Sequence, residues 1–204
     1  MGIGSIVETG RRAVFLDRDG VINKAVVRGA KPYPPASVAE LCILPGVHEA
    51  LLKLRAGGFL LYVVTNQPDV ARGTQTRASI ERMHAFIRSL LPLDGFYVCY
   101  HDNRDGCDCR KPAPGLVLSA AREHGIDLHE SYLVGDRWSD VEAGQRAGCR
   151  TAWIDCGYAE PAPRVPPDVR VVSLAEAATW ILNKRRKDEN HDEVSTGTQS
   201  KTLR

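Results

Sequence analysis

The sequence lacks a strong excess of charge of either sign. Its 204 residues include 27 lysines and arginines and 25 aspartates and glutamates, which gives a formal net charge of +2. The basic residues are spread along the chain and form no stripe, so the electrostatic footprint of a nucleic-acid-binding protein is missing. We therefore expect no nucleic-acid partner.

The sequence also lacks a long apolar run and a recognisable secretion signal. No stretch approaches the roughly 20 apolar residues of a membrane-spanning helix, and the first residues do not combine the basic, apolar and small segments of a signal peptide. We expect a cytoplasmic protein with no membrane partner. Six cysteines in such a chain indicate free thiols or a metal site in place of disulfides.

Strand-like and helix-like segments alternate between residues 11 and 182. Apolar, β-rich runs occupy residues 12–17, 59–64, 96–100, 131–134, 151–154 and 171–172. Helical patterns separate most of them, and this alternation predicts an α/β fold: a doubly wound, mostly parallel sheet with helices on both faces. The length fits a single domain without a large cap domain.

Three segments fall outside this pattern. Residues 1–10 are interpreted as a leader, and residues 183–204, which carry few apolar groups, as a disordered tail. Residues 23–44 contain Lys31-Pro32-Tyr33-Pro34-Pro35, and the prolines exclude a regular helix or a central strand there. We interpret residues 23–44 as a flap beside the end of the first strand, where loops often shape a substrate pocket.

Two carboxylates follow the first predicted strand, one residue apart. Asp17 and Asp19 come directly after the apolar residues 14–16, and ligands of open α/β sheets bind at the carboxyl ends of the strands. Two acids this close repel each other unless a cation or a shared proton relieves the repulsion. The simplest relief is Mg²⁺, which prefers oxygen ligands.

Other strand ends contribute polar groups to the same rim. Thr65 ends the second strand, Asp136 and Asp140 follow the fourth, and Lys111 lies in the loop after the third. Phosphoryl transfer depends on positioning and on electrostatic stabilisation, and a metal held by Asp17 and Asp136 would offset the repulsion between carboxylate and phosphate. One carboxylate can attack phosphorus, while a second protonates the leaving oxygen and then activates water.

Four short motifs therefore occur in order at the predicted strand ends. They are Asp17-Arg18-Asp19-Gly20-Val21, Thr65-Asn66-Gln67, Arg110-Lys111-Pro112, and Gly135-Asp136 with Asp140. Together they resemble the motifs of the haloacid dehalogenase superfamily of phosphatases, over roughly residues 11 to 182. The resemblance implies that Asp17 is the nucleophile, that Asp19 is the general acid and base, and that Thr65 and Lys111 stabilise the phosphate.

The resemblance also implies how the metal is bound. Mg²⁺ would be held by the Asp17 side chain, the Asp19 backbone carbonyl and the Asp136 side chain. Asp140 would lie behind these ligands and orient either the metal-bound waters or Lys111.

Four potential zinc ligands lie within eleven positions of one polar loop, residues 99–109. They are Cys99, His101, Cys107 and Cys109, and three thiolates with one imidazole satisfy tetrahedral zinc without an open position, which is typical of a structural site. A redox role for Cys107 and Cys109 is the alternative, although their spacing is not the usual Cys-x-x-Cys.

The zinc-loop pattern narrows the resemblance to two groups of phosphatases, which act on D-glycero-D-manno-heptose 1,7-bisphosphate or on histidinol phosphate. Residues 19–23 and 65–73 resemble the heptose group more closely. The length of the flap and Trp138, both near the predicted pocket mouth, depart from the heptose pattern as we know it.

The heptose resemblance implies a set of substrate-binding residues. Arg110 would help to select the phosphate at the far end of the substrate, and Arg137 stands where a lysine is common. Asn23 and Gln67 would line the sugar pocket, and Asn66 would also contact the substrate.

We therefore predict a Mg²⁺-dependent phosphatase, with a structural zinc, that converts heptose 1,7-bisphosphate to the 1-phosphate through an aspartyl-phosphate. Histidinol phosphate is the alternative substrate. An inactive, zinc-stabilised interaction module is the alternative of another class, and the presence of both Asp17 and Asp19 argues against it. We expect a monomer, and we interpret the histidines of helical segments, His84 among them, as surface or internally satisfied residues.

Overall fold

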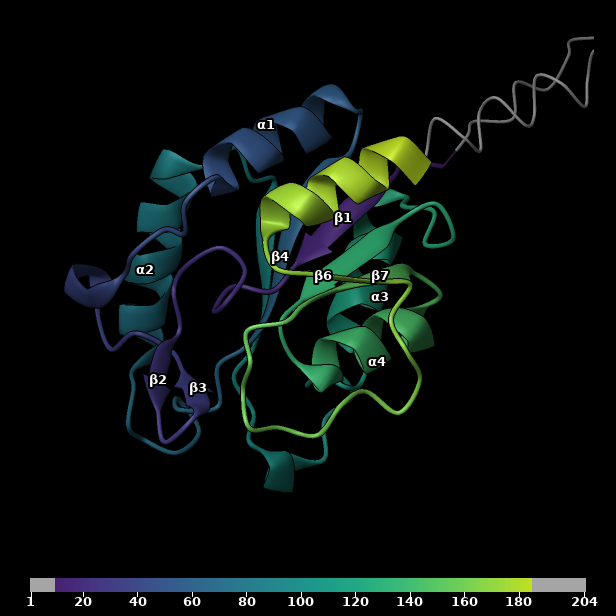
Figure 1. Cartoon of the computed structure of the whole chain (residues 1–204). Coiled ribbons are helices and arrows are strands. Elements are labelled where there is room, and N and C mark those ends of the chain that lie inside the picture. The colour runs from purple at the N-terminus through teal and green to yellow at the C-terminus, as the bar shows by residue number, and fades with distance from the viewer. Residues whose placement is uncertain (1–9, 185–204) are drawn as a thin grey trace, which may run out of the picture.

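The fold is built on one parallel sheet, and the computed structural model describes residues 10–184 (Figure 1). The predicted leader and tail therefore lie outside the described residues, apart from residue 10 and residues 183 and 184. The strands lie in the order β5-β4-β1-β6-β7-β8. Their bounds are Ala13–Leu16 (β1), Leu60–Asn66 (β4), Gly95–Cys99 (β5), Tyr132–Gly135 (β6), Arg150–Ile154 (β7) and Val169–Val171 (β8).

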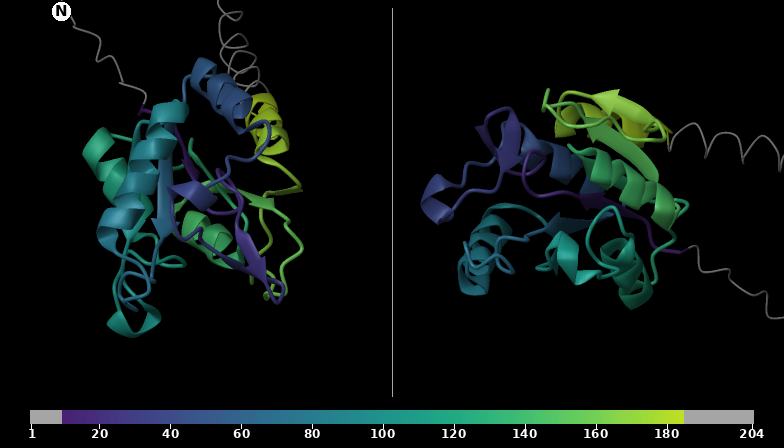
Figure 2. Two further views of the ribbon diagram at one scale, coloured as in Figure 1. Left: turned by 90° about the vertical axis from the view of Figure 1, so that its left-hand side faces the viewer. Right: turned by 90° about the horizontal axis from the view of Figure 1, so that it is seen from below.

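Helices cover both faces of this sheet, as predicted (Figures 1 and 2). Apart from two single 3₁₀ turns, they are α1 (Val47–Ala56), α2 (Arg77–Leu90), α3 (Gly115–His124), α4 (Trp138–Ala147) and a helix over residues 174–184. The side chains of β1 alternate between the two faces. Val14 and Leu16 pack in a cluster with α1 and the helix of residues 174–184, whereas Ala13 and Phe15 pack with α3 and α4.

The position of β1 explains where the site forms. After β1 the chain runs outward to β4 and β5, and it then returns to the other side of β1 to form β6, β7 and β8. All five pairings in the sheet are parallel. The carboxyl ends of β1 and β6 therefore flank the point at which the strand order reverses, which is where such sheets bind ligands.

The flap contains more regular structure than the sequence predicted. Residues Val26–Arg28 (β2) and Lys31–Tyr33 (β3) form an antiparallel hairpin that is separate from the main sheet (Figure 1). Pro32 is tolerated because only two short strands pair there, which is the edge position that proline accepts. Hydrogen bonds from distant segments reach the hairpin and the residues after it: Ala159 N donates to Ala30 O in the hairpin turn at 3.0 Å, and Gln75 Nε2 donates to Ala36 O at 2.7 Å.

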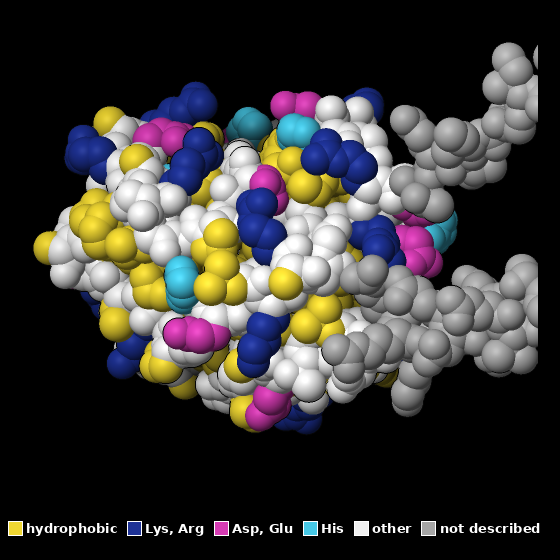
Figure 3. Space-filling model, turned by 90° about the horizontal axis from the view of Figure 1, so that it is seen from above, with side chains coloured by type: hydrophobic (Ala, Val, Ile, Leu, Met, Phe, Trp, Pro, Cys, Tyr) yellow, Lys and Arg dark blue, Asp and Glu magenta, His cyan; other side chains and the backbone are white. Residues whose placement is uncertain are grey.

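The surface carries mixed charge on the face seen in Figure 3, where α1 lies. Basic and acidic side chains alternate there with apolar ones, and neither sign forms a continuous patch. Within residues 10–184 no helix is both long and apolar enough to cross a membrane.

Candidate active site

Three carboxylates converge at the carboxyl ends of the central strands. Asp17 follows β1, Asp136 follows β6, and Asp140 lies in the first turn of α4. One oxygen from each lies within 4.8 Å of the others, and none of the three residues is more than 7% exposed. This group is called the carboxylate cluster below.

Lys111 enters the carboxylate cluster from the loop after β5. Its Nζ lies 2.8 Å from Asp17 Oδ1, 2.5 Å from Asp140 Oδ1 and 2.8 Å from the carbonyl oxygen of Val64. Burial alone would lower the pKa of Lys111, but Asp140 and Asp17 outweigh it and the net shift of the pKa is upward. Lys111 is therefore a fixed positive charge between two carboxylates, and Asp140 is one of the two acidic groups that hold it.

Asn66 holds the backbone of Lys111 in place. Its Nδ2 donates to the carbonyl oxygen of Lys111 at 3.0 Å, and its Oδ1 accepts from the Lys111 N–H at 3.1 Å. The side chain also borders the cavity described below. The observed contacts of Asn66 are thus structural, and the sequence had predicted only contact with substrate.

The charges of the carboxylate cluster are not fully compensated by the protein. Burial raises the pKa of Asp17 to about 6, against the opposing effect of Lys111. Burial, followed by Asp17 and Asp140, raises the pKa of Asp136 as well. Both carboxylate oxygens of Asp136 are buried, and hydrogen bonding by the Tyr158 hydroxyl, which lowers the pKa of Asp136, does not offset the rise.

This arrangement fits a divalent cation. Hard cations such as Mg²⁺ take carboxylate and carbonyl oxygens as ligands, and Asp136 offers a buried carboxylate beside those of Asp17 and Asp140. Gly20 leaves room for the Asp136 carboxylate, because a Cβ at Gly20 would lie 1.8 Å from Asp136 Oδ2. Gly20 also has a φ of +92°, which glycine adopts without strain. Asp17, Asp136 and the backbone of Asp19 are the groups that could hold the ion.

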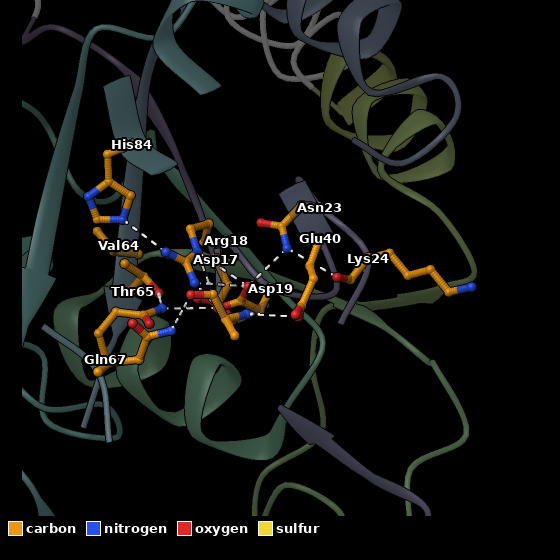
Figure 4. Close-up of polar contacts among 12 residues, drawn as sticks. Asp17, Arg18, Asp19, Asn23, Lys24, Glu40, Val64, Thr65, Gln67 and His84 are labelled. Atoms are coloured by element: carbon orange, nitrogen blue, oxygen red, sulfur yellow. Dashed lines mark hydrogen bonds and ion pairs between the residues drawn. The ribbon is translucent and has the colours of Figure 1, made fainter. Parts of the chain in front are cut away.

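Asp19 is surrounded by hydrogen-bond donors (Figure 4). Nε and Nη2 of Arg18 lie 2.9–3.2 Å from its two carboxylate oxygens. Asn23 Nδ2 donates to Oδ1 at 2.9 Å, and Gln67 Nε2 donates to Oδ2 at 3.0 Å. Gln67 also donates to Thr65 Oγ1 at 2.9 Å.

The prediction that Asn23 and Gln67 line the sugar pocket is not met. Both residues have no exposed surface, and neither borders the cavity over the carboxylate cluster. Their amide groups turn inward because the Asp19 carboxylate is the strongest acceptor within reach. The two residues fix Asp19 and leave substrate contact to others.

A cavity of about 420 Å³ opens over this floor. Asp17, Asp19, Thr65 and Lys111 form its base, and residues 31–34 of the flap form part of its wall. The flap therefore borders the cavity, which the position of the flap beside the first strand had suggested.

Three arginines border the cavity, and each is held by other polar groups. Arg110 Nε donates to Asn103 Oδ1 at 2.6 Å, and Arg137 Nε donates to Glu160 Oε2 at 2.8 Å. Arg72 donates to both carboxylate oxygens of Asp102, at 2.7 and 3.1 Å. The structure thus brings the predicted residues Arg110 and Arg137 to the cavity.

The sequence analysis did not identify Arg72 or Glu160. No periodic pattern marks either residue, since Arg72 lies in the loop before α2 and Glu160 lies in an irregular, proline-containing loop after β7. Only the folded chain brings them to the same cavity.

The four predicted zinc ligands also come together. Cys99, His101, Cys107 and Cys109 each offer a ligand atom within 4.8 Å of the others, and the closest measured pairs of these atoms are 3.2–3.7 Å apart. Ligands bound to zinc at about 2.3 Å would be about 3.8 Å apart at tetrahedral angles. The three cysteines form no disulfide, so this group of four side chains, called the thiolate cluster below, fits a closed, structural zinc site.

Comparisons with known proteins agree with this geometry. A family model described as HAD-hydrolase-like matches residues 108–177. D-glycero-β-D-manno-heptose-1,7-bisphosphate 7-phosphatase of Helicobacter pylori (strain J99) is 38% identical over 167 residues, which are 72% of this chain and 92% of that protein. The enzyme of the same name from Escherichia coli (strain K12) is 36% identical over 183 residues, 84% of this chain and 88% of its own.

A solved structure shows the same likeness. The crystal structure of D,D-heptose 1,7-bisphosphate phosphatase from B. bronchiseptica, complexed with magnesium and phosphate, superposes with a TM-score of 0.69 at 28% identity. The match covers 85% of this chain and 99% of that chain. The parallel sheet is that of the haloacid dehalogenase-like phosphatases, a class of phosphoric monoester hydrolases.

Within that class, the chain belongs to the family of the D-glycero-D-manno-heptose 1,7-bisphosphate phosphatases. The resemblance seen in the four motifs and in the zinc loop is confirmed.

Proposed function

We propose that the chain is a Mg²⁺-dependent phosphatase that hydrolyses the 7-phosphate of D-glycero-D-manno-heptose 1,7-bisphosphate and releases the 1-phosphate. One observation carries the proposal: Asp17, Thr65 and Lys111 form the floor of a single cavity whose rim carries three arginines. A charged floor suits the phosphate that reacts, and a basic rim suits a second phosphate on the same substrate.

The first step transfers the phosphoryl group to the protein. A carboxylate oxygen of Asp17 attacks phosphorus, the bond between phosphorus and the sugar oxygen breaks, and that oxygen takes a proton from Asp19. Lys111, fixed 2.8 Å from Asp17 Oδ1, offsets the negative charge that develops on the phosphoryl oxygens. The Thr65 hydroxyl is placed to donate a hydrogen bond to one of them.

The second step restores the enzyme. Water attacks the phosphorus of the aspartyl-phosphate and gives a proton to the ionised Asp19, the bond from phosphorus to the Asp17 oxygen breaks, and inorganic phosphate leaves. Asp17 is again a carboxylate and Asp19 again carries the proton that the next cycle requires. When bound by Asp17, Asp136 and the backbone carbonyl of Asp19, Mg²⁺ supplies the positive charge that lets carboxylate and phosphate approach each other.

The acidic groups of the cavity favour the heptose substrate over histidinol phosphate. The cationic amine of histidinol phosphate would bind best to a carboxylate that has no other partner. At the rim of the cavity, however, Glu160 pairs with Arg137, and Asp69 pairs with Arg72 at 3.4 Å. The arginines outnumber these acids at the rim. We therefore keep histidinol phosphate as the second substrate to be tested.

The decisive experiment measures phosphate release by the purified chain, with Mg²⁺, from each anomer of heptose 1,7-bisphosphate and from histidinol phosphate. We expect a clear preference for one heptose anomer, and no turnover by Asp17→Asn, whose amide is a poor nucleophile. A preference for histidinol phosphate would overturn the substrate assignment. Asp17→Asn activity close to wild type would overturn the mechanism.

A further inference from the structure

Arg18 lies between the two catalytic aspartates in the sequence, and it is completely buried. Its Nε and Nη2 both lie within 3.2 Å of the Asp19 carboxylate. Its Nη1 points the other way and lies 3.2 Å from Nε2 of His84, a residue of α2 (Figure 4). The guanidinium is thus held from two sides, by a carboxylate and by an imidazole.

His84 can hold this contact only as a neutral ring. A guanidinium donates hydrogen bonds and accepts none, so Nε2 must be the acceptor and the ring proton must be on Nδ1. Burial, and then Arg18, lower the pKa of His84 to about 4, which keeps the ring neutral near pH 7.

The surroundings of His84 fix its orientation. The ring stacks on Phe96 of β5 with centroids 4.7 Å apart and an interplanar angle of 21°. Its Nδ1 lies 3.8 Å from Glu81 Oε2, which is too long for a hydrogen bond. The other charged groups that act on the ring are Asp19 and Arg88, and both have smaller effects than Arg18.

We propose that His84 and Arg18 are positioning residues for Asp19, with His84 acting through Arg18. This inference rests on the function proposed above. Without the imidazole, the Arg18 Nη1 would face an apolar interior, and a buried donor without a partner shifts or draws in water. The guanidinium would then no longer hold the Asp19 carboxylate at a fixed angle.

The arrangement favours one half of the reaction. Hydrogen bonds from Arg18, Asn23 and Gln67 hold the Asp19 carboxylate in one orientation. In the second step this carboxylate must take a proton from water at a defined position. We therefore expect the contact between His84 and Arg18 to matter most for hydrolysis of the aspartyl-phosphate, and little for its formation from an ester with a good leaving group.

The test uses dinitrophenyl phosphate, whose leaving group needs no proton, in addition to the sugar phosphate. The variant His84→Leu removes the acceptor, and His84→Gln replaces it with an amide oxygen. For His84→Leu we expect kcat to fall about 10- to 100-fold with both substrates, as it does when a general base is no longer held in position. The rapid first release of dinitrophenolate should stay within about two-fold of wild type, because it does not require Asp19.

For dinitrophenyl phosphate, kcat/KM should stay within about two-fold of wild type in both variants, because it reports binding and the first step only and neither Arg18 nor His84 borders the cavity. KM should therefore fall together with kcat when the second step is slowed. His84→Gln should recover most of the lost kcat. Glu81→Gln is the matched control on the same turn of α2: it removes the charge nearest Nδ1, keeps an acceptor for the Tyr100 hydroxyl, and should behave as wild type.

Arg18→Lys tests the same contact from its other end, and it serves in place of His84→Leu if that variant does not fold. Lysine keeps the positive charge but lacks the planar guanidinium that contacts Asp19 and His84 at the same time. We therefore expect kcat to fall while the first release of dinitrophenolate persists. Wild-type kcat in His84→Leu or Arg18→Lys, or a first release that slows in parallel with kcat, would overturn the inference and leave the proposed function intact. Failure of the wild-type chain to hydrolyse any of these esters would instead overturn the proposed function, and the inference with it.

Discussion

The molecule contains two clusters of metal-ligating side chains that are built in opposite ways. The carboxylate cluster takes its members from the residues that directly follow β1 and β6 and from the first turn of α4, so the sheet holds Asp17, Asp136 and Asp140 together against their repulsion. The thiolate cluster takes all its members from residues 99–109. Apart from Cys99, which is fully buried, this loop is polar and largely exposed.

The difference shows what each metal would do. A sheet that already places the carboxylates would need no ion in order to fold, and a cation bound there would serve the reaction. A short polar loop buries too little apolar surface to fix its own shape, and zinc bound there would supply the stability. Removal of a ligand should therefore have opposite effects on stability in the two clusters.

The largest effect on stability is expected in the thiolate cluster. Cys107→Ser should lower the free energy of unfolding by about 3–5 kcal/mol and abolish stoichiometric zinc. Denaturant unfolding and metal analysis of the same sample would check this. Cys149→Ser, at a buried cysteine outside the cluster, is the control and should retain zinc. Unchanged stability with no zinc in the wild-type protein would contradict the comparison.

The carboxylate cluster should respond in the reverse sense. Asp136→Asn should lower kcat about 100-fold or more through loss of a metal ligand. It should also raise the free energy of unfolding of the metal-free protein by about 1–3 kcal/mol, because a neutral amide replaces a buried carboxylate that faces Asp17 and Asp140. Unfolding in the presence of a chelator measures this gain. A metal-free variant less stable than wild type would show that the cluster is not repulsive.

The repulsion within the carboxylate cluster should also make the stability of the metal-free protein depend on pH. The pKa of Asp17 is raised from 3.8 to about 6 in the folded state, so the stability due to its protonation is present below pH 3.8 and is lost as pH rises to 6. The change is of order 3 kcal/mol. Metal-free wild type and Asp17→Asn, unfolded at several pH values, should differ in slope over this window. Added Mg²⁺ should reduce the difference at the upper end of the window.

Most of the sheet was predictable because each strand end combines an apolar run with a polar motif. Asp17, Thr65, Lys111 and Asp136 meet because parallel strands end on one edge. The grouping of Cys99, His101, Cys107 and Cys109 was predictable because eleven residues contain all four. The fold class and the family could therefore be inferred before any coordinates.

The parts that were not predictable depend on packing between distant elements. The amides of Asn23 and Gln67 fit either a pocket or a buried carboxylate, and only the fold shows that they face Asp19. His84 had a detectable signal, since it shares the buried stripe of α2 with Ile80, Met83 and Ile87. A polar residue in such a stripe needs a partner, but the sequence does not show that the partner is Arg18.

The smallest effect is expected at the cavity rim, outside both clusters. Glu160→Gln should weaken the ion pair that holds Arg137 and raise KM for the bisphosphate about two- to five-fold with little change in kcat. Asp155→Asn, which loosens Arg170 away from the cavity, is the matched control in steady-state assays. An equal response of both variants would remove Arg137 from the substrate site.

The central claim is that Asp17 carries the phosphoryl group during turnover. The most direct measurement is peptide mass analysis of Asp19→Asn, quenched in acid during reaction with dinitrophenyl phosphate and Mg²⁺. The first step needs no acid with this ester, and the second lacks its base, so phosphate should accumulate on the peptide that contains Asp17. Phosphate on a different residue, or a wild-type enzyme that turns over while Asp19→Asn releases dinitrophenolate without labelling Asp17, would contradict the account.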